Sequence, residues 1–195
     1  MPSADPRPCF NAVVVFLGGL PVVLSVSAVV SSRRLPRVCR WVGQFSVVGF
    51  SGSRSGPGAG AVPLLGVLAA SVGSEVRVGC ARGVDEFVRS SCSSPVVFQA
   101  VGRSPAALVT RSVRLVRSLA GSPSSLLVVV PGRACPAGLV SGSSWCSGFG
   151  SGSWASAALA VGLGVPVLVW VGCPSWLPAW GSWVGVGGGW FVCGG

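Results

Sequence analysis

The sequence predicts an α/β domain built on an open, mainly parallel sheet of about five strands, with helices on both faces. Three observations predict it. From about residue 46 to residue 172, short apolar runs alternate with longer stretches of helical composition. Clusters of Gly, Ser and Pro separate them. Several short runs are apolar throughout, such as LLVVV at Leu126–Val130, and strands of this kind are typical of parallel sheets buried on both faces.

Five strands are expected. One of them alternates apolar with polar residues (EVRVG), and the others are mainly apolar. In chain order the strands are Ser46–Phe50, Glu75–Gly79, Pro95–Val101, Leu126–Val130 and Pro166–Val171.

Four helices are expected between these strands. Ser104 and Pro105 supply an N-cap and a proline at the first helical position of the longest helix. Gly162 and Gly164 end the last helix. The helices are Val62–Val72, Asp85–Ser91, the stretch from Ser104 to about Leu119, and the stretch from Gly150–Ser153 to Gly162.

The chain divides into three parts, of which only the middle one has a regular pattern. Residues 1–44 form an apolar N-terminal extension, residues 45–172 the α/β domain, and residues 173–195 a tail rich in Trp and Gly. The tail has no clear period, so no element is assigned to it.

Two uncharged stretches are long enough to cross a bilayer, Ala12–Val30 and Trp154–Gly172. Gly18, Gly19 and Pro21 disfavour a helix in the first stretch. The second is interrupted by glycines and a proline, so a helix followed by a buried strand is the better account. We therefore expect a cytoplasmic protein that is not associated with a membrane, with an N-terminal anchor as the alternative.

The composition is strongly biased. Lys, His, Tyr and Ile are absent, and Met, Thr, Asn, Gln, Asp and Glu together contribute nine of the 195 residues. Every codon of these ten amino acids contains adenine, so we infer an adenine-depleted coding strand. Arg is then the only available cation, and the net charge of +10 is partly a consequence of the bias. The charge is correspondingly weaker support for nucleic-acid binding.

The absent residues exclude several kinds of catalytic site. Without His there is no Ser-His-Asp or Cys-His relay, and without Lys there is no Walker lysine or Schiff base. The eight cysteines are never closer than 11 positions apart, whereas zinc sites use closely spaced pairs. We expect no catalytic residue, no metal and no cofactor, and buried thiols rather than a disulfide framework.

Four loops rich in Gly and Ser follow predicted strands. In a parallel sheet they lie at one edge, outside the carboxyl ends of the strands, where ligands bind. Their backbone N–H groups can approach an anion closely, and the last loop opens a helix, which favours phosphate. Arg54, Arg82 and Arg133 would add charge. The alternative is that these are only tight turns. The loops are Gly52–Ser55, Gly79–Asp85, Pro131–Arg133 and Gly148–Ser153.

Four motifs in this order and spacing resemble the SLOG superfamily of Rossmann-like domains. They are GFSGSRS, GCARGVDEF, LVVVPG and GSGSWASAALAVGLGVPVLV. The GCARGVD stretch resembles the ARGID-type motif of DprA, the DNA-processing protein that loads recombinase onto single strands. The spacing of ALVTRSVRLVRSLAGSPSSLLVVVPG resembles the YspA-like branch, which commonly has Arg-Asn where this chain has Arg111-Ser112. The resemblance covers the α/β domain and neither end of the chain.

The resemblance implies a Rossmann-like fold with a ligand-binding cleft. The residues that it places in the cleft are Gly52, Ser53, Arg54, Gly83, Asp85, Arg111, Gly132, Gly152 and Ser153. Three further phosphate-binding candidates lie in the Gly-rich loops: Arg82, Gly150 and Ser151.

One departure from the superfamily concerns catalysis. The related cytokinin-activating phosphoribohydrolases carry PGGxGTxxE, whose Glu is catalytic. Here Gly152 and Ser153 occupy the Gly-Thr place, and Ser156 stands where that Glu would be. A serine cannot replace a carboxylate as general base or stabilise an oxocarbenium ion. We therefore predict that the protein is not an enzyme.

Two groups of charged residues each leave two interpretations open. Asp85 could accept hydrogen bonds from a ribose diol, or it could cap the helix that it opens, an interaction that stabilises a helix by about 0.5–2 kcal/mol. Glu86 would be a first-turn partner of the helix dipole. Arg111, Arg114 and Arg117 lie on one side of a helix and could contact nucleic-acid phosphates or form a solvated face.

These observations favour non-enzymatic binding of a nucleotide or a nucleotide-derived phosphate ligand in the Gly-rich cleft. The first alternative is DprA-like binding of single-stranded DNA in DNA processing or recombination. The second is a degenerate nucleotide-processing hydrolase. The expected partner is the nucleotide, with single-stranded DNA and a second copy of the chain as alternatives.

Overall fold

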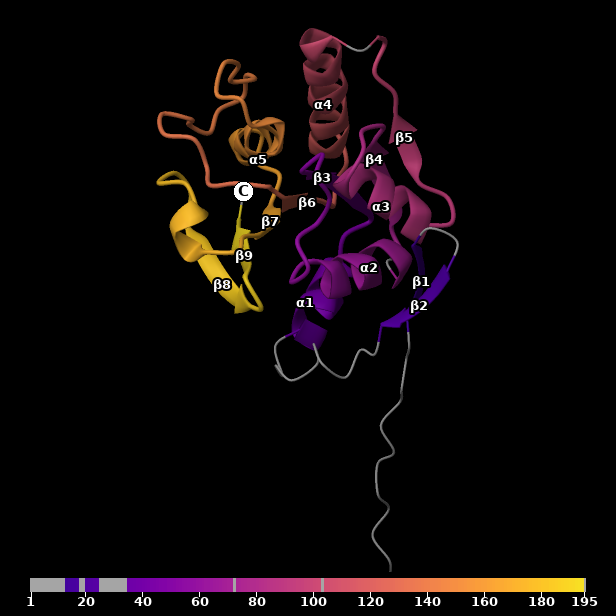
Figure 1. The fold of residues 1–195 in the computed structure, drawn as a ribbon. Coiled ribbons are helices and arrows are strands. Elements are labelled where there is room, and N and C mark those ends of the chain that lie inside the picture. The colour runs from indigo at the N-terminus through magenta and orange to yellow at the C-terminus, as the bar shows by residue number, and fades with distance from the viewer. Residues whose placement is uncertain (1–12, 18–19, 25–34, 72, 103, 195) are drawn as a thin grey trace, which may run out of the picture.

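A computed structural model describes residues 13–17, 20–24, 35–71, 73–102 and 104–194 (Figure 1). The strands are β1 (Val13–Leu17), β2 (Leu20–Leu24), β3 (Val47–Gly52), β4 (Glu75–Gly79), β5 (Val96–Phe98), β6 (Ser125–Val130), β7 (Val167–Trp170), β8 (Trp183–Gly187) and β9 (Trp190–Cys193). The helices are α1 (Leu35–Val42), α2 (Val62–Ser71), α3 (Val84–Ser91), α4 (Pro105–Ala120) and α5 (Gly152–Gly162), with a short 3₁₀ helix, η2, at Pro174–Trp176.

The main sheet has seven strands in the order β5-β4-β3-β6-β7-β9-β8. The five strands from β3 to β7 are mutually parallel, and β9 and β8 continue the sheet in antiparallel pairing. The prediction of an open, mainly parallel α/β sheet is confirmed, whereas the count of about five strands is wrong. The two additional strands come from the Trp/Gly-rich tail, which pairs with the β7 edge (Figure 1).

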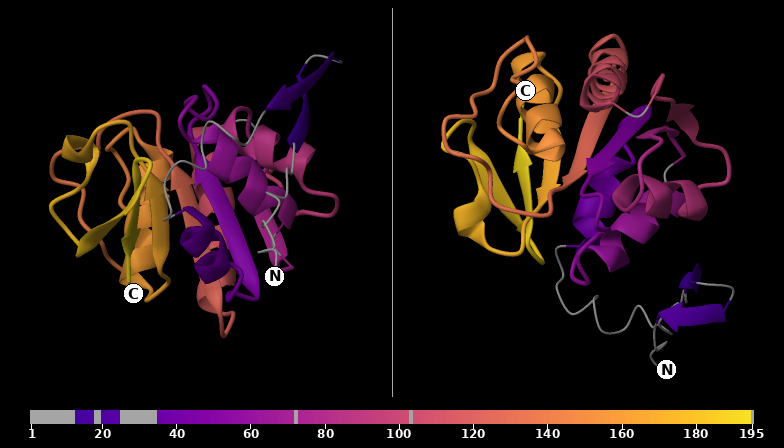
Figure 2. Two further views of the ribbon diagram at one scale, coloured as in Figure 1. Left: turned by 90° about the horizontal axis from the view of Figure 1, so that it is seen from below. Right: turned by 45° about the horizontal axis from the view of Figure 1, so that its top comes forward.

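Helices cover both faces of the sheet, as the sequence predicts (Figure 2). On one face α1, α2 and α3 pack in one apolar cluster, and on the other α4 and α5 pack in a second. The place of β6 between the two apolar clusters explains why its sequence is apolar throughout. Leu126, Val128 and Val130 belong to the first cluster, and Leu127 and Val129 to the second. Every residue of β6 is buried.

The predicted elements within the domain all form, with differences of a few residues at their ends. Strand β5 is shorter than predicted, because only Val96–Phe98 pairs with β4. The capping prediction for α4 is confirmed, since the Ser104 hydroxyl accepts a hydrogen bond from the Ala107 N–H at 3.1 Å and Pro105 stands at the first helical position.

The packed unit is longer at both ends than residues 45–172. Val38 and Val42 of α1 are buried in the first apolar cluster, and Trp190 of β9 lies in the same cluster. Local composition did not reveal these extensions, because each depends on pairing or packing with residues distant in sequence.

The cysteines at the seven described positions are free thiols, but the expectation of buried thiols is wrong for most of them. Cys193 is buried, Cys173 is exposed, and those at 39, 80, 92, 135 and 146 are partly exposed.

The two apolar stretches that are long enough to cross a bilayer have different outcomes. Residues 154–172 form most of α5 and then β7, as predicted. Of residues 12–30, the described parts are β1 and β2, which pair antiparallel, and the rest of that stretch lies outside the described residues. Among the described helices none has the length and apolar character that a bilayer crossing needs.

Candidate functional site

The sheet has a topological switch point between β3 and β6. From β3 the chain continues outward through β4 to β5, and it then returns to place β6 on the other side of β3. The loops after β3 and β6 therefore leave the sheet in opposite directions, toward α2 and α5. In open α/β sheets this divergence creates a crevice at the carboxyl ends of the strands, where ligands bind.

Ser53 connects three of the predicted loops at this edge. Its N–H donates to the Val130 carbonyl at the end of β6 (2.9 Å), and its carbonyl accepts from the Val84 N–H at the start of α3 (3.0 Å). A Cβ added at Gly132 would lie 2.6 Å from the Ser53 hydroxyl oxygen. The loops after β3, β4 and β6 are therefore in direct contact, as their predicted place at one sheet edge requires.

Packing accounts for two of the predicted cleft glycines. A Cβ at Gly52 would lie 2.6 Å from two side-chain carbons of Val84. Gly83 has φ +76°, a conformation that favours glycine, and a Cβ there would overlap the Ser53 carbonyl oxygen. For these two positions the alternative of a tight turn is sufficient, because the fold itself excludes a larger side chain.

The start of α5 is different because it is open. A Cβ at Gly152 would meet nothing within 4 Å, and this glycine has no positive φ. Ser151 is the N-cap residue but forms no side-chain capping bond. The first helical bond donated to the N-cap comes from the Ala155 N–H to the Ser151 carbonyl (3.0 Å), so the amides of residues 152–154 precede it and have no intrahelical acceptor. Donors of this kind are suited to an anion.

The loop after β6 is tied to this helix start. The indole N–H of Trp154 donates to the Arg133 carbonyl at 2.8 Å, and Trp154 is fully buried. Gly150 has φ +65°, and a Cβ there would lie 3.0 Å from a terminal nitrogen of Arg133. Arg133 therefore lies beside the open first turn of α5, at the side of the switch point formed by β6.

Asp85 and Arg111, both predicted to line the cleft, bind each other. Arg111 Nη1 lies 2.5 Å from Asp85 Oδ2, which also accepts from the Ala81 N–H at 3.2 Å. Asp85 is only 3% exposed, and the Arg111 side chain 12%. The pair joins α3 on one face of the sheet to α4 on the other, across the end of β4 at Gly79. A Cβ at Gly79 would overlap both charged groups.

The Asp85 carboxyl is not the cap of α3, because that helix has no side-chain capping bond. Burial raises the pKa of Asp85 above its ordinary value, and the Arg111 guanidinium offsets part of that effect. Arg89, which is not among the predicted site residues, donates to the carbonyls of Gly79 (2.6 Å) and Ala81 (3.1 Å). Arg89 lies four residues after Asp85, a spacing that places two side chains on the same side of a helix. This spacing is the feature of the sequence that could have identified Arg89 as a site residue.

Arg54, Arg82 and Arg133 are exposed on loops of the carboxyl edge. Over the described ranges the ion pairs are Arg77–Glu75 and Arg111–Asp85 alone, so these three arginines lack a carboxylate partner there. The edge that holds the switch point therefore carries uncompensated positive charge.

Ser156 lies in the interior rather than at the surface. It is 1% exposed, its hydroxyl donates to the Gly152 carbonyl at 2.9 Å, and the Ser51 hydroxyl lies 3.4 Å away. The Ser156 hydroxyl thus lies between α5 and β3.

No family model, curated protein or solved structure matches this chain. In the part of the chain that the structure describes, no three His, Cys, Asp or Glu side chains come together as a metal site would need.

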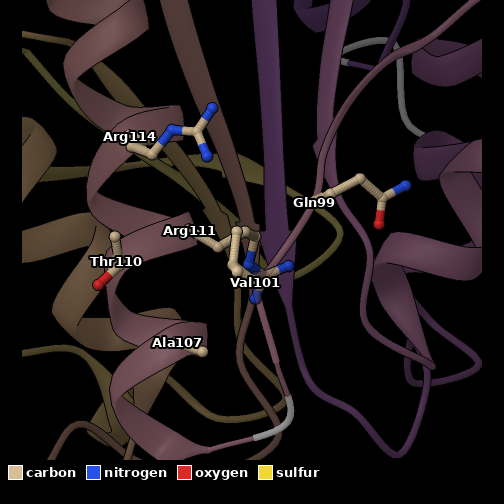
Figure 3. A pocket seen from close by; sticks show the side chains of 6 residues that line it. All are labelled: Gln99, Val101, Ala107, Thr110, Arg111 and Arg114. Carbon is tan, nitrogen blue, oxygen red and sulfur yellow. The ribbon is translucent and has the colours of Figure 1, made fainter.

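A hollow of about 150 Å³ lies apart from the switch point, between α4 and the segment that follows β5 (Figure 3). It contains Arg111 and Arg114 of the predicted arginine row, whereas Arg117 of the same row is exposed and outside it. Gln99 and Val101 were missed as site residues, because their place opposite α4 depends on how β5 enters the sheet. The lining residues are Gln99, Val101, Ala107, Thr110, Arg111 and Arg114.

Proposed function

We propose that this chain is a SLOG-like, Rossmann-like module that binds a nucleotide or nucleotide-derived phosphate ligand at the β3/β6 switch point without converting it chemically. The observation that carries the proposal is the open first turn of α5 beside that point, where Gly152 has no neighbour within 4 Å. A phosphate at this helix start would accept hydrogen bonds from N–H groups that have no acceptor within the helix. It would also interact favourably with the helix dipole.

The surrounding charge supports an anionic ligand. Arg133 lies beside the α5 start and Arg54 belongs to the loop after β3, so the two arginines flank the switch point from the two strands that form it. Both are exposed and can reach toward a bound phosphate, for which Arg forms strong charge-assisted bonds. Asp85 contributes little repulsion, because its charge is paired with Arg111 inside the protein.

The side chains near the site support binding rather than hydrolysis. Of the described carboxylates, Asp85 and Glu75 are paired with arginines, and Glu86 is exposed on α3. Ser156, in the place of the hydrolase Glu, cannot act as a general base at ordinary pH. In this proposal the degenerate-hydrolase alternative lacks a group that could activate water at the α5 start.

Single-stranded DNA is the second candidate ligand, and the exposed Arg114 and Arg117 of α4 favour it. Proteins that bind single strands without sequence preference stack the bases on accessible aromatic side chains. Of the aromatic residues near the loops, Phe50 and Trp154 are fully buried and Phe149 is half-buried. Because two of these three rings cannot stack on a base, we rank the free nucleotide first.

A pair of variants at one position tests the proposal. Gly152→Glu and Gly152→Gln add side chains of equal size where the structure has open space, so both should fold normally. The glutamate would lie near the phosphate, where charge repulsion at 4 Å and an effective dielectric of 20 is about 4 kcal/mol. We expect the Glu variant to lose affinity for nucleoside phosphates about 100-fold or more, and the Gln variant about 10-fold or less.

The measurement is calorimetric titration of the full chain with nucleoside mono-, di- and triphosphates and with a short single-stranded oligonucleotide. Equal affinities for the Glu and Gln variants would contradict the proposed site. Tighter binding of the oligonucleotide than of any nucleotide, with an affinity that falls steeply with salt, would favour the DNA alternative.

A further inference from the structure

We propose that the hollow between α4 and the segment after β5 is a second binding site, specific for a small oxyanion such as a phosphate or carboxylate group. The site is separate from the β3/β6 switch point, because β4 stands between β5 and β3 in the sheet. Figure 3 shows Arg111 and Arg114 on α4 and Gln99 and Val101 on the segment after β5, with the Gln99 side chain pointing away from α4. The inference does not depend on the proposed nucleotide site.

The size of the hollow restricts the ligand. Its volume is about 150 Å³, whereas pockets for whole cofactors or drug-sized ligands measure about 300–1,000 Å³. A water molecule occupies about 30 Å³ in the liquid. The hollow therefore has room for a compact group of a few heavy atoms and not for a complete nucleotide.

The donors that line the hollow suit an oxyanion. Arg111 and Arg114 line it with their guanidinium side chains, and no carboxylate is among the described residues that line it. Guanidinium N–H groups match the planar geometry of carboxylate and phosphate oxygens. The Thr110 hydroxyl already donates to the Ala106 carbonyl at 3.0 Å, so the available donors are those of Arg111 and Arg114.

Arg111 is held in place for this role. Its Nη1 is bound to Asp85, which fixes the guanidinium from the side of the protein interior. Its Nε is buried and has no hydrogen-bond partner among the residues that the structure describes. A buried donor without an acceptor is unfavourable, so a small shift of the guanidinium toward an oxygen in the hollow would be stabilising. Because the arginine is already ordered by Asp85, little further side-chain entropy is lost on binding.

Arg114 and Arg117 provide a matched pair of test variants. Both arginines are exposed on α4, but only Arg114 lines the hollow. Arg114→Gln and Arg117→Gln remove the same charge and keep similar side-chain size. Loss of a hydrogen bond to a charged group corresponds to a decrease in affinity of about 10-fold or more. We therefore expect Arg114→Gln to weaken phosphate binding by about that factor, and Arg117→Gln to change it less than about twofold by long-range charge alone.

The experiment is an NMR titration of the full chain with inorganic phosphate, and separately with acetate, which distinguishes a phosphate from a carboxylate preference. Saturable shifts at Gln99, Val101 and the α4 residues 107–114 are expected, and Gly152→Glu should leave them unchanged. Shifts that do not saturate, or that are lost equally in both Arg variants, would overturn the proposal. So would an oligonucleotide that binds along both Arg114 and Arg117 while free phosphate and acetate do not bind.

Discussion

The carboxyl edge of the sheet has a closed part and an open part, and a glycine lies at the centre of each. Gly79 ends β4 beneath the Asp85–Arg111 pair, and any Cβ there would overlap the two charged groups. Gly152 begins α5 in open space. Glycine is therefore present at these two positions for different physical reasons. In the closed part the glycine is required by the packing, and in the open part the fold would accept a larger side chain.

This difference shows how a Gly-rich motif should be interpreted. A glycine that the fold itself requires gives no information about a ligand. A glycine that the fold does not require is compatible with a ligand that approaches the backbone from outside. Three predictions test this comparison, from the largest expected effect to the smallest.

The largest effect is expected from an alanine scan of the two glycines. Gly79→Ala must displace the buried ion pair, and breaking such a pair costs about 4 kcal/mol. Gly152→Ala should change the free energy of unfolding by less than about 1 kcal/mol, with stabilisation the expected sign because alanine restricts the unfolded chain. Denaturant melts of both variants measure the difference. Similar losses for both glycines would show that the distinction between closed and open parts is wrong.

The ion pair itself should contribute nearly as much. Asp85→Ala leaves the Arg111 guanidinium buried without a carboxylate, and we expect a loss of about 3 kcal/mol. If Asp85 were only a helix cap, the loss would be about 1 kcal/mol. Glu86→Ala on the same helix is the control, because this exposed neighbour should change stability by less than about 0.5 kcal/mol. A loss below 1 kcal/mol for Asp85→Ala would mean that the pair does not hold α3 to α4.

The smallest effect concerns pH. Burial raises the pKa of Asp85, so the folded state binds a proton more readily than the unfolded state does. The contribution of this group to stability is therefore complete below the unfolded pKa and is lost as pH rises through the folded pKa. Relative to Asp85→Asn, the wild type should gain stability as pH falls through that window, by at most about 1.4 kcal/mol per pH unit. A stability difference that is independent of pH would contradict the raised pKa.

The sequence predicted the local elements well because their signals are local. Ser104 and Pro105 determine where α4 begins through contacts within its first turn. The uniformly apolar sequence of β6 reflects its burial on both faces of the sheet. Strands β8 and β9 were not predicted. Their residues are mostly Trp, Val and Gly without a clear period, and β9 becomes a strand by pairing with the exposed edge of β7.

The candidate site was predicted in part. The loops after β3, β4 and β6 do meet at Ser53, as their place after successive parallel strands requires. The sequence could not show that Asp85 and Arg111 bind each other, because they are 26 residues apart and lie on helices of opposite faces. Nor could it place Gln99 opposite Arg114, since this depends on where β5 ends.

Within residues 45–172, the sequence by itself determined which segments become strands and helices and where several of them begin and end. It also determined that the Gly-rich loops share one edge of a parallel sheet. Periodicity, capping and turn formation depend on residues only a few positions apart, so they can be read from a single chain. The tertiary structure decided the order of the strands, the pairing of the tail with β7, the partner of each charged side chain and which glycines are crowded. These features depend on contacts between residues distant in sequence, which form only when the whole core packs.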